Sequence, residues 1–451
     1  MNKREFDMLL YINENTMIDL EEAARKLFLS EEQLQTICNS LEDAGFINNY
    51  NLTQKGTDYL NTHKVDNAII LAAGMSTRFV PLNFEKPKGL LEINGETLIE
   101  QQINQLREKG IQEIIVVVGH MKEQFEFLVE KYGVILVPTD DYMRKNNHAS
   151  VYAARQYLKN SIVTSSDLYF TDNIFQQYAY DAYYCTVYVP GKTAERGIVT
   201  DDDDKIIETM YGDKCCDIWV TLGYAFFNQR FSDNFISILN DTFNLPETSN
   251  KFWADIQDEN LDLLYMYAKR CDSETINEFD SLEELREFDS KYLYDSGSTI
   301  MHKLCYLLAA NENNIIGIES LKQLKTSMFK FRCKGDIYIC DVDPGDEEKI
   351  TFQGRTYYQC RDFSEGSVKL FKMDKNIKVG GVHQVDISKE LDDLYNYSKE
   401  FKEYHDRALP LCAAENVISQ FANLLHFTEL SGRHSVLERP LSEVNGRLFF
   451  S

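Results

Sequence analysis

Residues 67–98 read NAIILAAGMSTRFVPLNFEKPKGLLEINGETL and decide the fold of the region around them. The apolar run 68–71 has the composition and length of a buried parallel strand. A loop of small residues follows, and small side chains let backbone amides approach a polyphosphate closely, aided by the positive end of a following helix. This loop supplies the nucleotide-binding candidates Leu71, Ala72, Ala73, Gly74, Met75, Ser76, Thr77 and Arg78.

Two cations extend this pattern. Arg78 ends the loop, and its guanidinium can pair with phosphate oxygens through several donors. Lys88 lies in the segment KPKG, where Pro87 stiffens the backbone that presents the ammonium group. We expect Arg78 and Lys88 to be the catalytic cations. The alternative is a Rossmann-like strand–loop–helix that binds another nucleotide or none.

The motif LAAGMSTRF followed by KPKGLL resembles the signature of nucleotidyltransferases that activate sugar phosphates, phosphocholine and phosphonates. It is most similar to the bacterial CTP:phosphocholine and CTP:2-aminoethylphosphonate cytidylyltransferases. The resemblance extends over residues 66–290, about half of the chain. It implies that CTP and a small phosphate or phosphonate acceptor are the partners of this protein.

The composition fits a globular protein of two to four domains, since the chain has 451 residues and is 43% hydrophobic. Its formal net charge of -25 makes nucleic acid and anionic membranes poor partners. Apolar runs are too short to span a bilayer, and residues 1–7 lack the apolar stretch of a signal peptide. Ten scattered cysteines without a CxxC pair predict reduced thiols and a cytoplasmic location.

Residues 1–64 predict three short helices, a small β-hairpin and a last helix, an order that resembles a winged helix-turn-helix. Ser30 and Gln33 form a capping-box pattern at the start of the third helix. That helix contains no Lys or Arg, which a recognition helix needs for phosphate contacts and base readout. We therefore expect a structural or regulatory domain, with DNA binding as the alternative.

Residues 66–295 alternate strands and helices, which predicts an α/β domain with a doubly wound, mixed sheet. His120 follows the predicted strand 114–118, and we interpret it as structural. Asn147 and Ser150 lie at the start of a later helix. The resemblance makes them candidates for contact with the cytidine, and helix capping is the alternative.

A predicted strand over residues 161–167 ends in Asp167. Ligands of α/β sheets bind beyond the carboxyl ends of the strands, so this carboxylate is well placed. The resemblance implies that Asp167 is a magnesium ligand and that Asp280, in the segment TINEFDSLEEL, is the second. Two carboxylates completed by substrate phosphates and water are a usual way for proteins to hold Mg²⁺.

The acceptor candidates are Trp253, Asp255, Tyr224 and Arg196. The segment KFWAD resembles a Trp-Asp segment of the phosphocholine enzymes, and an aromatic face beside a carboxylate suits an ammonium group. For Tyr224 the alternative is a place in the aromatic core. Arg196 is a candidate for the acceptor phosphate or phosphonate.

Residues 296–390 predict one helix and a small β-rich module, with strands near 329–332, 336–340, 349–352 and 368–371. Residues 391–451 predict a helical segment. Within it, ALPLCAAENVIS at 408–419 resembles the opening of serine hydroxymethyltransferase-type pyridoxal-phosphate enzymes, with Ala414 where that family has a serine. Because residue 451 comes long before a Schiff-base lysine would, we expect an incomplete segment that does not bind the cofactor productively.

The resemblance as a whole implies a Mg²⁺-dependent cytidylyltransferase. An oxygen of a small amino-bearing phosphate or phosphonate would attack the α-phosphorus of CTP and release pyrophosphate. Such an acceptor is already anionic, so alignment and charge neutralisation suffice without a general base. The alternatives are a sugar-phosphate nucleotidyltransferase that uses another NTP and a nucleotide-sensing winged-helix regulator. A homodimer is compatible with the sequence.

Overall fold

The computed structural model describes residues 1–15, 17–212, 215–362 and 368–373. The chain divides into two compact units. One contains residues 1–331 with 340–345 and 361–369, and the other contains 332–339, 346–360 and the chain from 370 onward. The predicted pyridoxal-phosphate-like segment at 391–451 lies outside the described residues.

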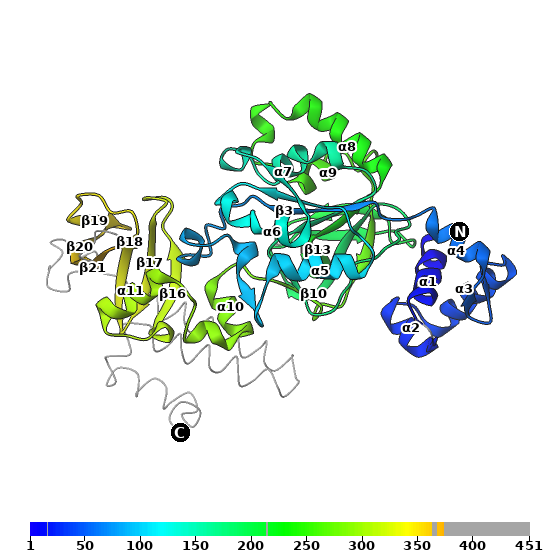
Figure 1. Ribbon diagram of the computed structural model, residues 1–451, viewed down its shortest axis with the longest axis horizontal. Helices are drawn as coiled ribbons and strands as arrows, with labels where there is room; N and C mark the ends of the chain where they lie inside the picture. Colours follow the sequence, from blue (N-terminus) through cyan, green and yellow to red (C-terminus); the bar gives the residue numbers. More distant parts are fainter. Residues whose placement is uncertain (16, 213–214, 363–367, 374–451) are drawn as a thin grey trace, which may run out of the picture. The chain divides into compact units, whose positions relative to one another are not determined.

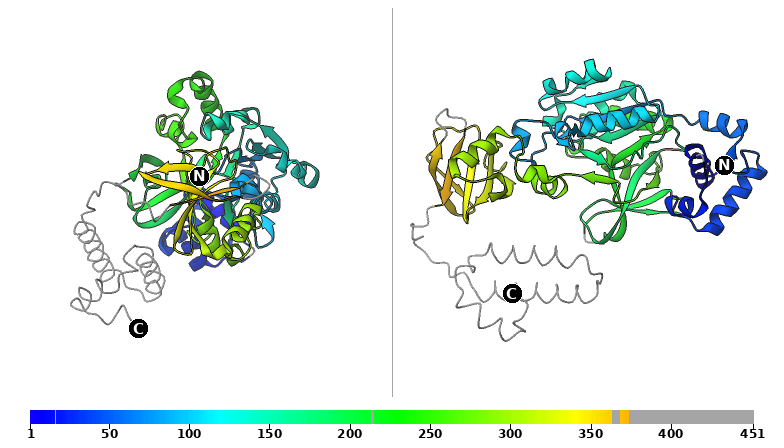
Figure 2. Two further views of the ribbon diagram at one scale, coloured as in Figure 1. Left: turned by 90° about the vertical axis from the view of Figure 1, so that its left-hand side faces the viewer. Right: turned by 60° about the horizontal axis from the view of Figure 1, so that its bottom comes forward.

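The N-terminal region has its own small core (right-hand view of Figure 2, dark blue). Ser30 caps the third helix by accepting a hydrogen bond from the Gln33 amide, as the sequence predicts. Tyr178 and Tyr180, from the following domain, pack against this core. The elements are α1 (Lys3–Glu14), α2 (Leu20–Lys26), α3 (Glu31–Asp43), β1 (Ile47–Asn48), β2 (Asn51–Leu52) and α4 (Gln54–Asn61). Their order is the expected one, and the winged-helix assignment stays a prediction.

A mixed nine-stranded sheet forms the centre of the next domain, as predicted. Its parallel part pairs β8, β3, β6 and β7, and the antiparallel β13 continues it beyond β8. The strands are β3 (Asn67–Ala72), β6 (Ile114–Val118), β7 (Ile135–Pro138), β8 (Ser161–Ser165), β10 (Tyr183–Lys192), β11 (Gly197–Thr200), β12 (Ile206–Met210), β13 (Cys216–Phe227) and β14 (Tyr267–Arg270).

Helices cover both faces of this sheet, because its strands carry apolar side chains on both sides. One core cluster joins Ile70 and Val116 to Ile103 of α5, and the other joins Ile69 and Val117 to Phe231 of α8. Figure 1 shows α7, α8 and α9 together on one side of β3. The covering helices are α5 (Leu98–Glu108) and α6 (Phe127–Tyr132) on the first face, and α7 (His148–Ala153), α8 (Gln229–Thr242) and α9 (Trp253–Asp258) on the second.

Shorter elements complete the domain. Strand β9 begins directly after Asp167 and pairs with β15, which leads into the segment that contains Asp280. These elements are β4 (Glu92–Ile93), β5 (Glu96–Thr97), β9 (Leu168–Phe170), β15 (Ile276–Glu278) and α10 (Leu282–Phe288).

The region after residue 296 is β-rich, as predicted. It contains α11 (Thr299–Leu308), β16 (Ile315–Ser320), β17 (Met328–Cys333), β18 (Asp336–Asp341), β19 (Lys349–Phe352), β20 (Arg355–Asp362) and β21 (Lys369–Met373). The sheet order is β16-β17-β18-β21-β20-β19, and β16 and β20 are the strands that the sequence analysis missed. Among the described residues, none of the helices has the length and apolar character of a membrane span.

Candidate active site

The small-residue loop begins where β3 ends, at the carboxyl edge of the sheet. The Ala73 carbonyl accepts a hydrogen bond from the His120 amide at 3.1 Å, which ties the loop to the end of β6. A Cβ added at Gly74 would meet no atom within 4 Å, so the backbone here faces open space. This geometry leaves room for a ligand against the loop backbone.

Lys88 is buried at the end of this loop region, with its side chain only 7% exposed. Its Nζ lies 2.9 Å from Asp167 Oδ2 and 3.3 Å from Asp280 Oδ1. Burial opposes the charge on the ammonium group, but the two carboxylates outweigh it and raise the pKa of Lys88. Gly89 allows the close approach of this segment to the sheet, because a Cβ there would lie 2.8 Å from Ser166 Oγ.

Arg78 approaches the same carboxylate from the solvent side. Its Nη1 lies 2.8 Å from Asp280 Oδ2, and its side chain is 76% exposed. Asp280 is thus shared between a buried lysine and an exposed arginine. The structure brings together four predicted residues that are separated by up to about two hundred positions in the chain.

Glu278 is a fifth member of this group that the sequence analysis missed. It ends β15, opposite Leu168, and its side chain reaches the surface. Partial loss of solvation together with the neighbouring Asp167 raises its pKa to about 7. The signal was present in the sequence, because Glu278 and Asp280 stand two residues apart and so share one side of an extended segment. We call Arg78, Lys88, Asp167, Glu278 and Asp280 the charged edge.

The donor set of the charged edge fits a hard divalent cation. Asp167 Oδ1 is buried and has no hydrogen-bond partner among the described residues, so one carboxylate oxygen lacks a donor or a cation. Carboxylate oxygens with open positions for water and phosphate are the environment that Mg²⁺ prefers.

Asn147 and Ser150 lie at the start of α7, where the sequence analysis left cytidine contact and helix capping open. The Asn147 side chain makes no capping hydrogen bond to α7. Its Oδ1 instead accepts a hydrogen bond from the Trp253 amide at 2.9 Å. His148, beside it, lies 2.6 Å from the Lys251 carbonyl through Nδ1. These bonds fix the start of α7 to the segment that begins α9, and Ser150 is buried within it.

Three of the acceptor candidates lie in one group with further aromatic and acidic residues. Trp253 stacks on Tyr184 with ring centroids 4.6 Å apart, and the Arg196 guanidinium lies 5.2 Å from the same Tyr184 ring. We call Tyr184, Arg196, Tyr211, Trp253, Asp255 and Asp258 the aromatic–carboxylate cluster.

Arg196 is nearly closed off within this cluster. It forms a buried ion pair with Asp258, and its Nη2 also donates to Gln257 Oε1 at 2.7 Å. The Tyr211 hydroxyl lies 3.2 Å from Asp255 Oδ1 and 3.1 Å from Asp258 Oδ2. The sequence analysis did not identify Asp258 or Tyr211, because their link to Arg196 depends on the fold.

The cluster is electrostatically close to the charged edge. Burial raises the pKa of Tyr184 to about 12, and the Glu278 carboxylate contributes to this increase. The side chains of Tyr184, Trp253 and Arg196 are buried, whereas Tyr211 is about half exposed.

Tyr224 does not belong to this group, which corrects the prediction that it lines one pocket with Trp253. The side chain is fully buried, and its hydroxyl lies 2.6 Å from that of Tyr183. Tyr224 belongs to the core cluster on one face of the sheet, whereas Trp253 belongs to the cluster on the other face. The sequence analysis named the core position as the alternative, and the structure has it there.

The comparisons agree with the architecture. Residues 68–270 match the family model described as a MobA-like NTP transferase domain. The chain is 35% identical over 222 residues to the choline-phosphate cytidylyltransferase of Streptococcus pneumoniae, covering 49% of this chain and 96% of the relative. It is 34% identical over 232 residues to the 2-aminoethylphosphonate cytidylyltransferase of Lancefieldella rimae, covering 51% and 94%.

A solved structure of CTP:phosphocholine cytidylyltransferase from Streptococcus pneumoniae is 34% identical, with a TM-score of 0.48, and covers 50% of this chain and 97% of its own. The N-terminal 64 residues and the far C-terminal segment lie outside the matched family model, so their winged-helix and pyridoxal-phosphate resemblances stay predictions. Both curated relatives are matched over almost their whole length. The chain therefore belongs to the nucleotidyltransferase family of the bacterial choline-phosphate and 2-aminoethylphosphonate cytidylyltransferases.

Proposed function

We propose that the protein transfers CMP from CTP to a small amino-bearing phosphate or phosphonate, such as phosphocholine or 2-aminoethylphosphonate, and releases pyrophosphate. The observation that carries the proposal is the buried Lys88 ammonium between Asp167 and Asp280, at the edge of the sheet where the small-residue loop faces open space. The names of the two relatives support the choice of CTP and of the acceptor class.

The nucleotide side of the site consists of the loop from Leu71 to Arg78. Its backbone amides would bind the triphosphate, and the exposed Arg78 guanidinium would pair with phosphate oxygens. Asn147 and Ser150 are the proposed contacts to the cytidine, since the Asn147 amide group is bonded to Trp253 and has a fixed orientation.

Asp167 and Asp280 are the proposed Mg²⁺ ligands, and we add Glu278 because its carboxylate lies in the same group. The bound ion would lower the electrostatic cost of gathering the triphosphate against these carboxylates. Lys88 would hold the acceptor and donor phosphates close together by pairing with oxygens of both.

The reaction is a displacement at the α-phosphorus. An acceptor oxygen forms the new bond to this phosphorus, the bond to the oxygen that bridges to the β-phosphorus breaks, and pyrophosphate leaves with that electron pair. Because the acceptor oxygen is already anionic at neutral pH, the chain needs no side chain to remove a proton. Alignment and the positive charge of Lys88 and Arg78 are its main contributions.

The acceptor ammonium group would bind at the aromatic–carboxylate cluster. Asp255 would supply negative charge and the half-exposed Tyr211 ring an aromatic face, whereas the Trp253 and Tyr184 rings are buried, stack on each other and would support this surface. Arg196 donates to Asp258 and Gln257, so we propose that it positions this carboxylate. This assignment differs from the expected contact between Arg196 and the acceptor phosphate.

The experiment is an assay of pyrophosphate release with Mg²⁺ that pairs CTP, UTP, ATP and GTP with phosphocholine, 2-aminoethylphosphonate, phosphoethanolamine and glucose 1-phosphate. We expect turnover with CTP and at least one amino-bearing acceptor, and loss of that turnover when Mg²⁺ is chelated. Turnover with glucose 1-phosphate alone would refute the acceptor class. Tight nucleotide binding without turnover for any pair would refute the transferase activity.

A further inference from the structure

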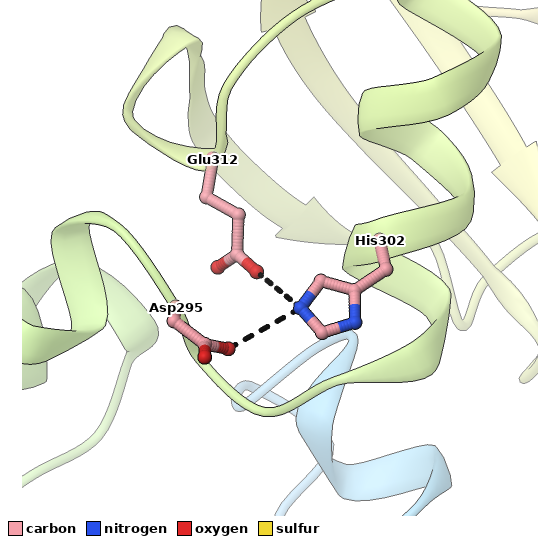
Figure 3. Close-up of side chains that lie close together, drawn as sticks. All are labelled: Asp295, His302 and Glu312. Atoms are coloured by element: carbon pink, nitrogen blue, oxygen red, sulfur yellow. Dashed lines mark hydrogen bonds and ion pairs between the residues drawn. The ribbon is translucent and has the colours of Figure 1, made fainter.

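Asp295, His302 and Glu312 face one another outside the charged edge and beyond the matched family residues (Figure 3). Asp295 lies in the loop before α11, His302 lies on α11, and Glu312 begins a short 3-10 helix at Glu312–Asn314. His302 Nε2 lies 3.2 Å from Asp295 Oδ1 and 3.5 Å from Glu312 Oε1. All three potential ligand atoms lie within 4.8 Å of one another.

Hydrogen bonds within the protein do not satisfy this group. A ring nitrogen carries at most one hydrogen, and the hydrogen bond of His302 Nε2 is to Asp295. Glu312 is only 3% exposed, yet its Oε1 has no hydrogen-bond partner among the described residues. A buried carboxylate oxygen without a donor or a cation is costly. This oxygen is also the one that faces the imidazole.

The backbone around the group is held in place. Glu312 Oε2 accepts a hydrogen bond from the Ser296 amide at 3.0 Å, and Asp295 Oδ1 accepts one from the Gly297 amide at 2.9 Å. The buried Arg286 side chain donates to the carbonyls of Glu312 and Ile315 at 3.1 and 2.7 Å. The ligand atoms are therefore oriented before any ion binds, as a site requires.

We propose that Asp295, His302 and Glu312 bind a divalent transition-metal ion of the Zn²⁺ class, with water completing the coordination. Ligands about 2.0–2.2 Å from a tetrahedral ion are about 3.3–3.6 Å apart, close to the two distances measured from Nε2. A neutral imidazole with two carboxylates suits Zn²⁺ and disfavours Mg²⁺, which prefers oxygen ligands. The ion would satisfy Glu312 Oε1, and the exposed sides of Asp295 and His302 leave it a route from solvent.

The site is also linked to the loop that carries Lys88. Glu85, three residues before Lys88, accepts hydrogen bonds from the amides of Thr299 and Ile300 at 3.0 and 3.3 Å and thereby caps α11. The loop before α11, residues 295–298, contains Asp295 of the proposed site. It also contains Ser298, whose hydroxyl donates a hydrogen bond to Glu85. Binding of the ion would hold residues 295–298 and α11 together, and both are hydrogen-bonded to Glu85.

The test measures Zn²⁺ affinity of the full chain by competition with a chromophoric chelator, in excess Mg²⁺ so that the charged edge does not compete. The variants are D295N, H302Q and E312Q, and E287Q is the matched control because Glu287 is exposed on α10. We expect wild type and E287Q to bind one more Zn²⁺ per chain than H302Q and D295N, or to bind it at least about tenfold more tightly. Substituting Co²⁺ should give visible absorption bands that H302Q loses.

Equal Zn²⁺ stoichiometry and affinity in wild type, D295N and H302Q would overturn the proposal and leave an ion pair of protonated His302 with two carboxylates. These two variants decide the matter, since the side chains of Asp295 and His302 are 64% and 56% exposed and their replacement does not disturb a core. E312Q adds support when its circular dichroism spectrum matches that of wild type. Because the readout is metal binding, it is independent of the transferase activity.

Discussion

The charged edge and the aromatic–carboxylate cluster are both made of acidic and basic side chains, but they satisfy their charges differently. At the charged edge, Lys88 faces the carboxylates of Asp167 and Asp280, and Asp167 Oδ1 is left without a hydrogen-bond partner among the described residues. In the cluster, Arg196 donates to Asp258, Gln257 and Thr221. The first group has capacity left for a ligand, and the second is mostly closed.

This difference predicts how substitutions act in the two regions. Changes at the charged edge should reduce turnover far more than stability, because the carboxylates of Asp167 and Asp280 are partly exposed and these residues have interactions still to make with substrate. Changes at Arg196 should reduce stability first, because its interactions are already made inside the protein.

The largest effect is expected from Lys88→Met, which keeps the length of the side chain and removes its charge. We expect kcat to fall by roughly a hundredfold to a thousandfold, since removal of one preorganised charge stabiliser costs about that much. The measurement is CTP-dependent pyrophosphate release, with circular dichroism to confirm the fold.

Lys86→Met is the matched control for that experiment. Lys86 lies two residues away, is 44% exposed, and approaches Glu92 at 3.7 Å on the surface. It should retain activity close to wild type. If both variants lose activity equally, or if Lys88→Met remains fully active, the charge of Lys88 has no specific role in turnover.

The next effect is expected from Arg196→Met. The change leaves the carboxylate of Asp258 without its cation in a largely buried setting, and breaking such a pair costs about 3–5 kcal/mol of the free energy of unfolding. Urea unfolding measures this loss, and Arg144→Met, at an exposed position, is the control. A stable Arg196→Met variant whose KM for the acceptor alone rises would instead make Arg196 a direct acceptor ligand.

The site residues named from the sequence are those that a local segment specifies, and their roles in binding and catalysis stay predictions. Leu71 to Arg78 and Lys88 come from one continuous motif, and Asp167 and Asp280 each follow a recognisable strand. Glu278 was not predicted, although it stands two residues before Asp280 in the same extended segment. The α/β class and the mixed sheet of residues 66–295 followed from the alternation of apolar runs with helices, whereas the order of the strands came only from the structure.

The parts that failed depend on information that no short segment contains. Tyr224 and Ala225 are adjacent on β13, and a step of one residue along a strand moves a side chain to the opposite face. The aromatic type of Tyr224 therefore did not reveal its face. Asp258 lies 62 positions from Arg196, so their pairing appears only after folding. The strand β16 was missed because its sequence contains Gly317, and a glycine inside an apolar run weakens a strand pattern. In the structure Gly317 has a φ of 59°.

A smaller effect is expected from Tyr224→Phe. Loss of the hydrogen bond with Tyr183 should cost about 1 kcal/mol of the free energy of unfolding and leave the KM for the acceptor unchanged. Tyr183→Phe removes the same bond from the other side, so the double variant should lose less than the sum of the two single losses. A raised KM for the acceptor in Tyr224→Phe at unchanged stability would return Tyr224 to the acceptor site.

The smallest effect concerns His148, whose ring helps to join α7 to the segment before α9. Burial lowers the pKa of His148 and outweighs the hydrogen bond that Nδ1 donates to the Lys251 carbonyl, which acts in the opposite direction, so the folded state favours the neutral ring. An unfolded histidine takes up a proton near pH 6.5, so this contribution to stability is present above that pH and is lost as the pH falls toward the folded pKa. His148→Gln should remove this loss, which is at most about 1.4 kcal/mol per pH unit. Urea unfolding between pH 7.5 and 5.5, with His120→Gln as the control, measures it. A wild-type slope in His148→Gln would mean that the link between α7 and the segment before α9 does not depend on the charge of this ring.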